Sequence, residues 1–320
     1  MSNNRWILVW ILAFAINYLS HSLFELNSSS SLELKSIILD TLSRVEVTDL
    51  SKAKEYRLRI FWEASVLAYL VAALTASLWG IRTYVKCIGK SLRHPIIWVA
   101  AGTIASELFR IGTSGESSAS FNTIFCTTYE ALEHSPYVTA DFMSKASFLI
   151  QLINVLAVCS PGFLLMGISA ALTIPDSKRR SSLERLIERD SLIDQSVLIG
   201  SLMMLMGLIH MGCWMDWPVD IWPDSELKAS AIALNASVYA YWGICFSSML
   251  FLVYGGSKWT WKKTVMDVLA NNHPDIDPVL FVTDHDLGFQ IRRHLPHALA
   301  IVLPVLSSMA GSGSNILTMH

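Results

Sequence analysis

The stretch VLIGSLMMLMGLIHMGCWM, residues 197–215, decides the fold because it contains no Asp, Glu, Lys or Arg. A bilayer hydrocarbon core about 30 Å thick needs roughly 20 consecutive apolar residues in a helix. This stretch has that length, and DWPVDIWP follows it at residues 216–223. The sequence therefore predicts a transmembrane helix that ends at a turn rich in tryptophan, aspartate and proline.

The composition of the whole chain agrees with this segment. Of the 320 residues, 52% are apolar and 16% are charged, and the mean hydropathy is +0.44. Soluble domains usually carry about 25% charged residues. We therefore expect an all-α polytopic membrane protein that contacts the lipid bilayer. The formal net charge of −2 gives no basic field, so we expect no direct contact with nucleic acid.

Five further segments have the length and apolarity of transmembrane helices. They lie at about 6–24, 60–82, 95–112, 146–174 and 229–255. Together with the stretch quoted above, which forms the fifth span in chain order at 196–215, they make six. The segment 95–112 is the weakest, because Glu107 and Arg110 lie in its last turn. Pro161 predicts a kink or break within 146–174. The run 295–310 has an intermediate length, so we expect six spans with seven as the alternative.

The distribution of basic residues predicts the orientation. With the amino terminus inside, fifteen of the 24 Lys and Arg residues lie in internal segments. Cytoplasmic loops of membrane proteins carry such an excess. We therefore expect a cytoplasmic amino terminus, in an integral protein of the bacterial inner (plasma) membrane.

This threading divides the chain into four parts. Residues 1–24 form a retained anchor helix, 25–59 an external amphipathic segment, 60–255 the core membrane bundle, and 256–320 a cytoplasmic and membrane-associated tail. Residues 177–195 read as a charged cytoplasmic helix that leads into the fifth span. Within the tail, NNHPDIDP predicts a turn and VLFVT a strand.

The tryptophans after the fifth span predict an interfacial belt. Trp214, Trp217 and Trp222 fall where indole rings favour the headgroup layer. Pro218 and Pro223 are expected to stop the helix and turn the chain.

Four polar residues within the spans are candidates for a functional role: Gln151, Asn154, His210 and Asn235. Gln151 and Asn154 share a helix face, and a hydrogen bond across a helix interface explains them better than a permeation path. The predicted spans carry no charged residue at their centres, which argues against an ion-coupled pump.

No catalytic or metal-binding motif stands out, so we assign no catalytic residue and no metal ligand and favour a protein that is not an enzyme. We expect no cofactor. A bis-histidine haem stays a minor alternative, because His21 and His210 both fall near the outer ends of spans. Cys126 and Cys213 also fall on the external side, where an oxidising compartment would allow a disulfide between them.

Three functions fit these features. The first is a non-catalytic membrane subunit of a larger envelope assembly, of the secretion or conjugation type, with protein partners or as a homo-oligomer. The second is an oligomeric channel or membrane-permeabilising effector, for example in antiviral defence. The third is a membrane-embedded redox or lipid-modifying enzyme.

Overall fold

The computed structural model describes residues 7–27, 33, 35–40, 48–89, 102, 118–174, 182–221, 226–285, 287 and 296–306. The regular structure within these residues is entirely helical, and five helices are long and apolar enough to cross a bilayer. They are α1 (Ile7–Phe24), α3 (Asp49–Ile88), α6 (Ala140–Ala171), α7 (Ser182–Asp220) and α8 (Glu226–Asn272). The prediction of an all-helical chain is confirmed for these residues, and the five long apolar helices fit a multi-pass membrane protein.

Shorter helices connect or flank the five long ones. They are the 3₁₀ turn η2 (Glu25–Asn27), the π-helix η3 (Phe121–Cys126), α5 (Thr127–Glu133), α9 (Pro278–Asp284) and a last helix, Pro296–Leu306. The predicted strand VLFVT is wrong, because these residues lie in α9. Asp277 caps α9 by accepting hydrogen bonds from the backbone N–H of Val279 and Leu280, and Pro278 suits its first turn.

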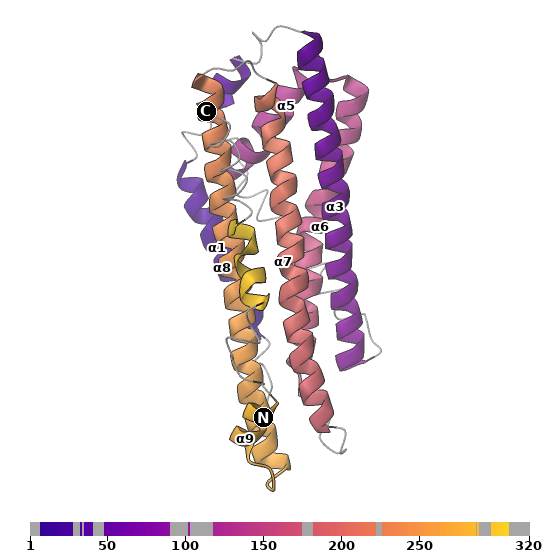
Figure 1. Cartoon of the computed structure of the whole chain (residues 1–320), viewed down its shortest axis with the longest axis vertical. Coiled ribbons are helices and arrows are strands. Elements are labelled where there is room, and N and C mark those ends of the chain that lie inside the picture. Colours follow the sequence, from indigo (N-terminus) through magenta and orange to yellow (C-terminus); the bar gives the residue numbers. More distant parts are fainter. Residues whose placement is uncertain are drawn as a thin grey trace.

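The long helices lie side by side along the longest axis of the molecule (Figure 1). α3 packs on α6 and α7, α7 packs on α8, and α1 packs on α8. We call the two ends of this bundle the Asp190 end and the Asp220 end. α1 and α7 start at the Asp190 end, whereas α3, α6 and α8 start at the Asp220 end.

The predicted span 95–112 lies outside the described residues apart from Gly102. The chain is described up to Gly89, at the Asp190 end, and again from Ser118. Ser118 bonds Glu25 at the end of α1, which places it at the Asp220 end. Six spans and a cytoplasmic amino terminus stay predictions.

The long helices extend beyond the predicted spans. α3 has 40 residues and begins at Asp49, inside the segment predicted to be external. α8 has 47 residues, about 70 Å at 1.5 Å per residue, and runs well past residue 255. α7 joins the predicted charged helix to the fifth span without a break. These helices are roughly twice as long as a bilayer core is thick.

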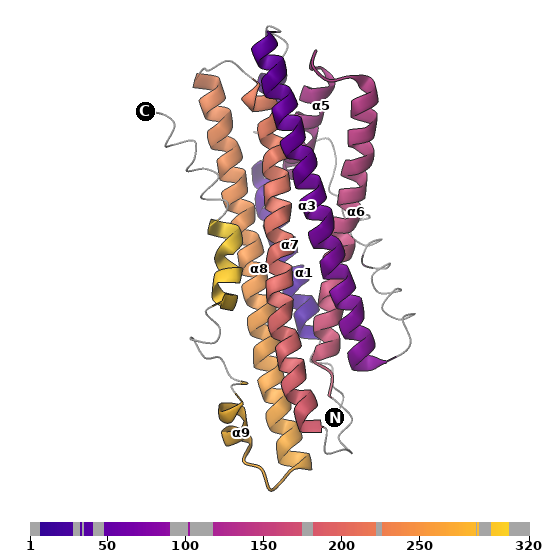
Figure 2. The ribbon, with the colours of Figure 1, turned by 45° about the vertical axis from the view of Figure 1, so that its right-hand side comes forward.

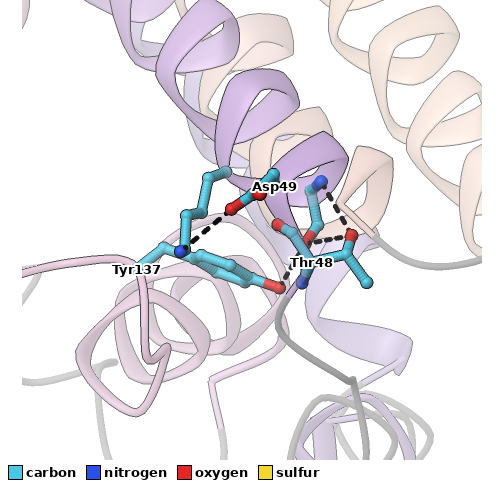
Figure 3. Close-up of polar contacts among 5 residues, drawn as sticks. Thr48, Asp49 and Tyr137 are labelled. Carbon is cyan, nitrogen blue, oxygen red and sulfur yellow. Dashed lines mark hydrogen bonds and ion pairs between the residues drawn. The ribbon is translucent and has the colours of Figure 1, made fainter.

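A capping box fixes the start of α3 (Figure 3). The Thr48 hydroxyl accepts a hydrogen bond from the backbone N–H of Ser51 at 3.1 Å, and the Thr48 N–H donates to the Ser51 hydroxyl at 2.9 Å. The Tyr137 hydroxyl, from the turn before α6, donates to Ser51 Oγ at 2.7 Å. The cap therefore sets where α3 begins and also ties α3 to α6.

Two prolines lie inside helices rather than at breaks. α6 continues through Pro161, and α7 continues through Pro218 to Asp220. The prediction that Pro218 stops the helix is wrong. Neighbouring helices can satisfy the one backbone carbonyl that a proline frees, so membrane helices tolerate proline.

α3 and α6 approach each other closely at two glycines. A Cβ added to Gly80 would lie 2.0 Å from the carbonyl oxygen of Phe163, and one added to Gly167 would lie 2.8 Å from Gly80 Cα. Ser77 Oγ donates to Ser160 Oγ at 3.1 Å in the same contact. Small residues allow this backbone approach in membrane helix pairs.

Candidate functional site

Gln151 and Asn154 lie on the outward side of α6. Gln151 is exposed and Asn154 half-buried, and the neighbouring Phe148 and Val155 are also exposed. Neither side chain makes a hydrogen bond with another described residue, so the predicted bond across a helix interface is not seen among the described helices. A carboxamide on an apolar outer face is costly in lipid unless it finds a partner.

Two of the three tryptophans predicted to form an interfacial belt, Trp214 and Trp217, lie inside the bundle. Trp214 is 2% exposed and Trp217 is fully buried. Their rings lie 5.6 Å and 5.5 Å from that of Trp62 on α3, and Phe142 of α6 also contacts Trp217. Packing against Trp62 of α3 and Phe142 of α6 buries these two side chains inside the bundle, whereas the sequence predicted them at the membrane interface. Trp222 lies outside the described residues.

His210 and Asn235 tie helices together. The Nδ1 of His210 lies 3.2 Å from the Ser65 hydroxyl, and its ring packs between Trp62 and Tyr69. The Asn235 amide donates to the carbonyl of Met215 at 3.1 Å and to Asp216 Oδ1 at 2.9 Å. These contacts join α7 to α3 and α8.

His21 contacts a different aromatic partner, Trp242 of α8, with ring centroids 5.1 Å apart. Among the described residues, no three His, Cys, Asp or Glu side chains come together as metal ligands would. The bis-histidine haem remains an untested prediction.

A cavity of about 360 Å³ with a mixed polar and apolar lining lies at the Asp220 end between α3, α7 and α8. Small-molecule sites usually have volumes of about 300–1,000 Å³. Its lining residues are Arg57, Leu58, Phe61, Leu208, Ile209, Gly212, Cys213, Asp216, Asp220 and Tyr239. The Tyr239 hydroxyl donates to the carbonyl of Gly212 at 2.9 Å, which fixes one wall.

The charges around this cavity are of both signs. Asp216 and Asp220 contribute two carboxylates, and Arg57 contributes a guanidinium from an exposed position on α3. Lys54, Arg57 and Lys228 lie close enough for their charges to act on Asp220. Sequence reasoning missed this site because its charged residues come from helix ends that were assigned to separate segments.

A buried charge cluster (Asp190, Asp194 and Lys258) lies at the opposite end of the bundle. The Lys258 ammonium lies 2.8 Å from Asp190 Oδ1 and 2.7 Å from Asp194 Oδ1. The Lys258 side chain is 6% exposed and that of Asp190 is fully buried. The Tyr254 hydroxyl donates to Asp194 Oδ1 at 2.8 Å. The Lys258 ammonium therefore bridges two carboxylates inside the protein.

Arg189, beside this cluster, closes the ends of two helices. Its guanidinium donates to the carbonyl of Ala170 at 3.1 Å, to Thr173 Oγ1 at 2.7 Å and to the carbonyl of Thr173. It also donates to the carbonyl of Cys87 at 3.1 Å. A cation at the carboxyl ends of α3 and α6 satisfies free carbonyls and opposes the negative helix ends.

The helix Pro296–Leu306 lies along the side of the bundle, beside α8 in both views (Figures 1 and 2). The His297 ring stacks on Tyr254 with centroids 5.7 Å apart, and the Ser201 hydroxyl donates to the carbonyl of Ala300. The described part of this helix is shorter than the roughly 20 residues of a full crossing.

All five cysteines are free thiols, including Cys126 and Cys213. Cys213 lines the cavity, and Cys126 lies in η3. Burial raises the pKa of the Cys126 thiol, although the nearby charge of Lys35 opposes the shift. A raised pKa lowers the thiolate fraction and slows oxidation. The disulfide between these two residues is not formed in the structure and stays a prediction for peptide mapping.

Comparison of this chain with protein-family models, with curated proteins and with solved structures found no match. Its function is therefore inferred from the geometry of its helices and of the sites described above.

Proposed function

We propose that this chain is a non-catalytic, multi-pass membrane subunit of a larger envelope assembly, of the secretion or conjugation type. The observation that carries the proposal is a projection at the Asp190 end. It consists of residues 182–195 of α7, residues 257–272 of α8, and α9. In Figure 1 the lower ends of α7 and α8, with α9, reach below the end of α3.

The apolar core of the bundle continues into the projection. Trp261, Val265 and Leu269 of α8 are fully buried, and so are Leu186 and Ile193 of α7. α9 closes this core with two buried residues, Phe281 and Val282. Because these residues are packed, the projection holds a defined shape, as a docking element requires.

Two apolar residues are exposed at the end of the projection. Val279 is 62% exposed and Leu280 is 59% exposed, side by side on α9, and we call this pair the tip. Such a pair can form the centre of a surface that another protein covers. The tip supports a role in assembly and gives a direct test of it.

Replacing both tip residues, Val279→Glu with Leu280→Glu, should remove partner proteins without unfolding the bundle. Acidic residues near the start of a helix are favoured by its dipole, so α9 should persist. We expect wild-type protein, purified in mild detergent, to retain fixed partners by mass spectrometry, and we expect the double variant to lose most of them.

Leu50→Glu is the matched control. Leu50 is 68% exposed in the first turn of α3, at the opposite end of the bundle. This variant should keep the partners. Purification of the wild-type chain as a lone monomer, or partners that survive the tip variant, would contradict the proposal.

The oligomeric-channel alternative is favoured by one observation, the outward carboxamides of Gln151 and Asn154. In a homo-oligomer packed through α6, these side chains would line a shared polar lumen. Overexpression should then depolarise the membrane, and Gln151→Leu with Asn154→Leu should abolish the effect. Thr75→Leu is the control, because Thr75 is also exposed but its hydroxyl already donates to the carbonyl of Val71. An unchanged membrane potential on wild-type overexpression would count against a channel.

A further inference from the structure

The cavity at the Asp220 end lies where two apolar stretches end. On α3 the uncharged run begins after Glu63, and on α7 it ends at Met215, directly before Asp216. The cavity walls, Arg57–Phe61 on α3 and Leu208–Asp220 on α7, lie across this boundary. In a membrane protein such a boundary marks the level of the lipid headgroups.

An apolar stripe leads along α7 to the cavity. Leu198, Leu202 and Ile209 are 43%, 44% and 41% exposed and recur at helical spacing on one face. Phe61 of α3, which is 59% exposed, stands at the mouth of the cavity. The cavity, which has charged groups and apolar side chains in its lining, is thus continuous with an apolar face of α7 that runs into the bilayer.

We propose that this cavity binds the headgroup of a phospholipid that carries a primary ammonium beside its phosphate, namely an ethanolamine phospholipid. The ammonium donates hydrogen bonds to the carboxylates of Asp216 and Asp220. The Arg57 guanidinium binds the phosphate, for which its planar set of donors is suited. An acyl chain lies along Leu198, Leu202 and Ile209.

The arrangement of charges selects this headgroup among common phospholipids. Asp216 and Asp220 can accept hydrogen bonds from a cation inside the cavity, in addition to the charges of Lys54, Arg57 and Lys228 that already act on Asp220, and a primary ammonium offers three donors. A choline headgroup is cationic but has no N–H. A glycerol headgroup carries the phosphate without a cation. Asp216 already accepts one hydrogen bond from Asn235, yet a carboxylate has about four lone-pair sites and can accept further bonds.

The test is native mass spectrometry of the full-length, delipidated protein, titrated with ethanolamine, choline and glycerol phospholipids of identical acyl chains. The wild type should bind the ethanolamine lipid at least about tenfold more tightly than the other two, since charge-assisted hydrogen bonds distinguish them. Asp220→Asn and Asp216→Asn should lower the ethanolamine-to-choline ratio toward one. Arg57→Gln should weaken both lipids equally and leave the ratio unchanged.

Lys52→Gln is the control for Arg57→Gln, because Lys52 is an exposed cation on α3 that pairs with Asp49 outside the cavity. It should leave all three affinities unchanged. Thermal melting of each variant separates loss of binding from loss of fold, and Asp220→Asn is the more informative carboxylate variant because Asp216 also holds Asn235.

Three results would overturn the inference. One is equal binding of ethanolamine and choline lipids by the wild type. Another is an ethanolamine preference that survives Asp220→Asn. The third is displacement of the lipid by soluble phosphoethanolamine at the same concentration, which would make this a site for a soluble zwitterion. The projection lies at the other end of the bundle, so each of these results leaves the proposed assembly role untouched.

Discussion

Lys258→Met should lower the free energy of unfolding by about 3–5 kcal/mol, the usual cost of removing one partner from a buried ion pair. Asp190 and Asp194 would lose their shared ammonium while both stay buried. Carboxylates in that position must take up protons or draw in water, and either change disrupts the contact between α7 and α8. Thermal unfolding in detergent and the yield of folded protein measure the effect.

The triple variant Lys258→Met, Asp190→Asn and Asp194→Asn should recover part of that loss. It leaves no buried charge without its partner, although the two buried amides still need hydrogen-bond partners. Lys262 is an exposed lysine one turn further along α8, so Lys262→Met should change the midpoint of thermal unfolding little. A Lys258→Met midpoint equal to that of Lys262→Met would show that the buried charge cluster does not stabilise the fold.

Gly80→Leu should separate α3 from α6. Even the first carbon of the new side chain would lie 2.0 Å from the carbonyl oxygen of Phe163, which is backbone and cannot turn away. Overpacked cores typically lose about 1–3 kcal/mol of stability. We expect the free energy of unfolding to fall by more than this, because a whole helix must move rather than one side chain.

A disulfide reports this separation directly. Ser77 Oγ and Ser160 Oγ lie 3.1 Å apart, so Ser77→Cys with Ser160→Cys should cross-link on oxidation. Adding Gly80→Leu should abolish the cross-link, whereas Gly255→Leu should not, because a Cβ at Gly255 meets no atom within 4 Å. Efficient cross-linking in the presence of Gly80→Leu would contradict the close contact.

The helical class of the chain could be predicted because it depends on local composition. The uncharged run 197–215 has the length of a bilayer crossing, and this can be recognised without knowing which other segments it contacts. The positions of Trp214 and Trp217 could not be predicted in the same way. An interfacial belt and a buried aromatic cluster have the same sequence pattern, and the packing of Trp62 and Phe142 from two other helices decides between them.

The charge cluster and the cavity depend on contacts between helices that lie far apart in the sequence. Asp190 and Asp194 share a helix face by their spacing alone, which is visible in the sequence. The ion pairs of Lys258 with these two residues depend on how α7 and α8 align, which the sequence does not show. The cavity likewise needs Arg57 and Asp216 on neighbouring helix ends, and the sequence had placed Arg57 in a separate external segment.

The role as an assembly subunit is tested most directly by placing a photo-crosslinking amino acid at position 280 of the tip and irradiating native membranes. We predict one or a few discrete covalent adducts with other proteins, and none from the same group placed at position 50. A position-280 sample that yields no protein adduct under conditions where the chain is folded and abundant would contradict the proposed role.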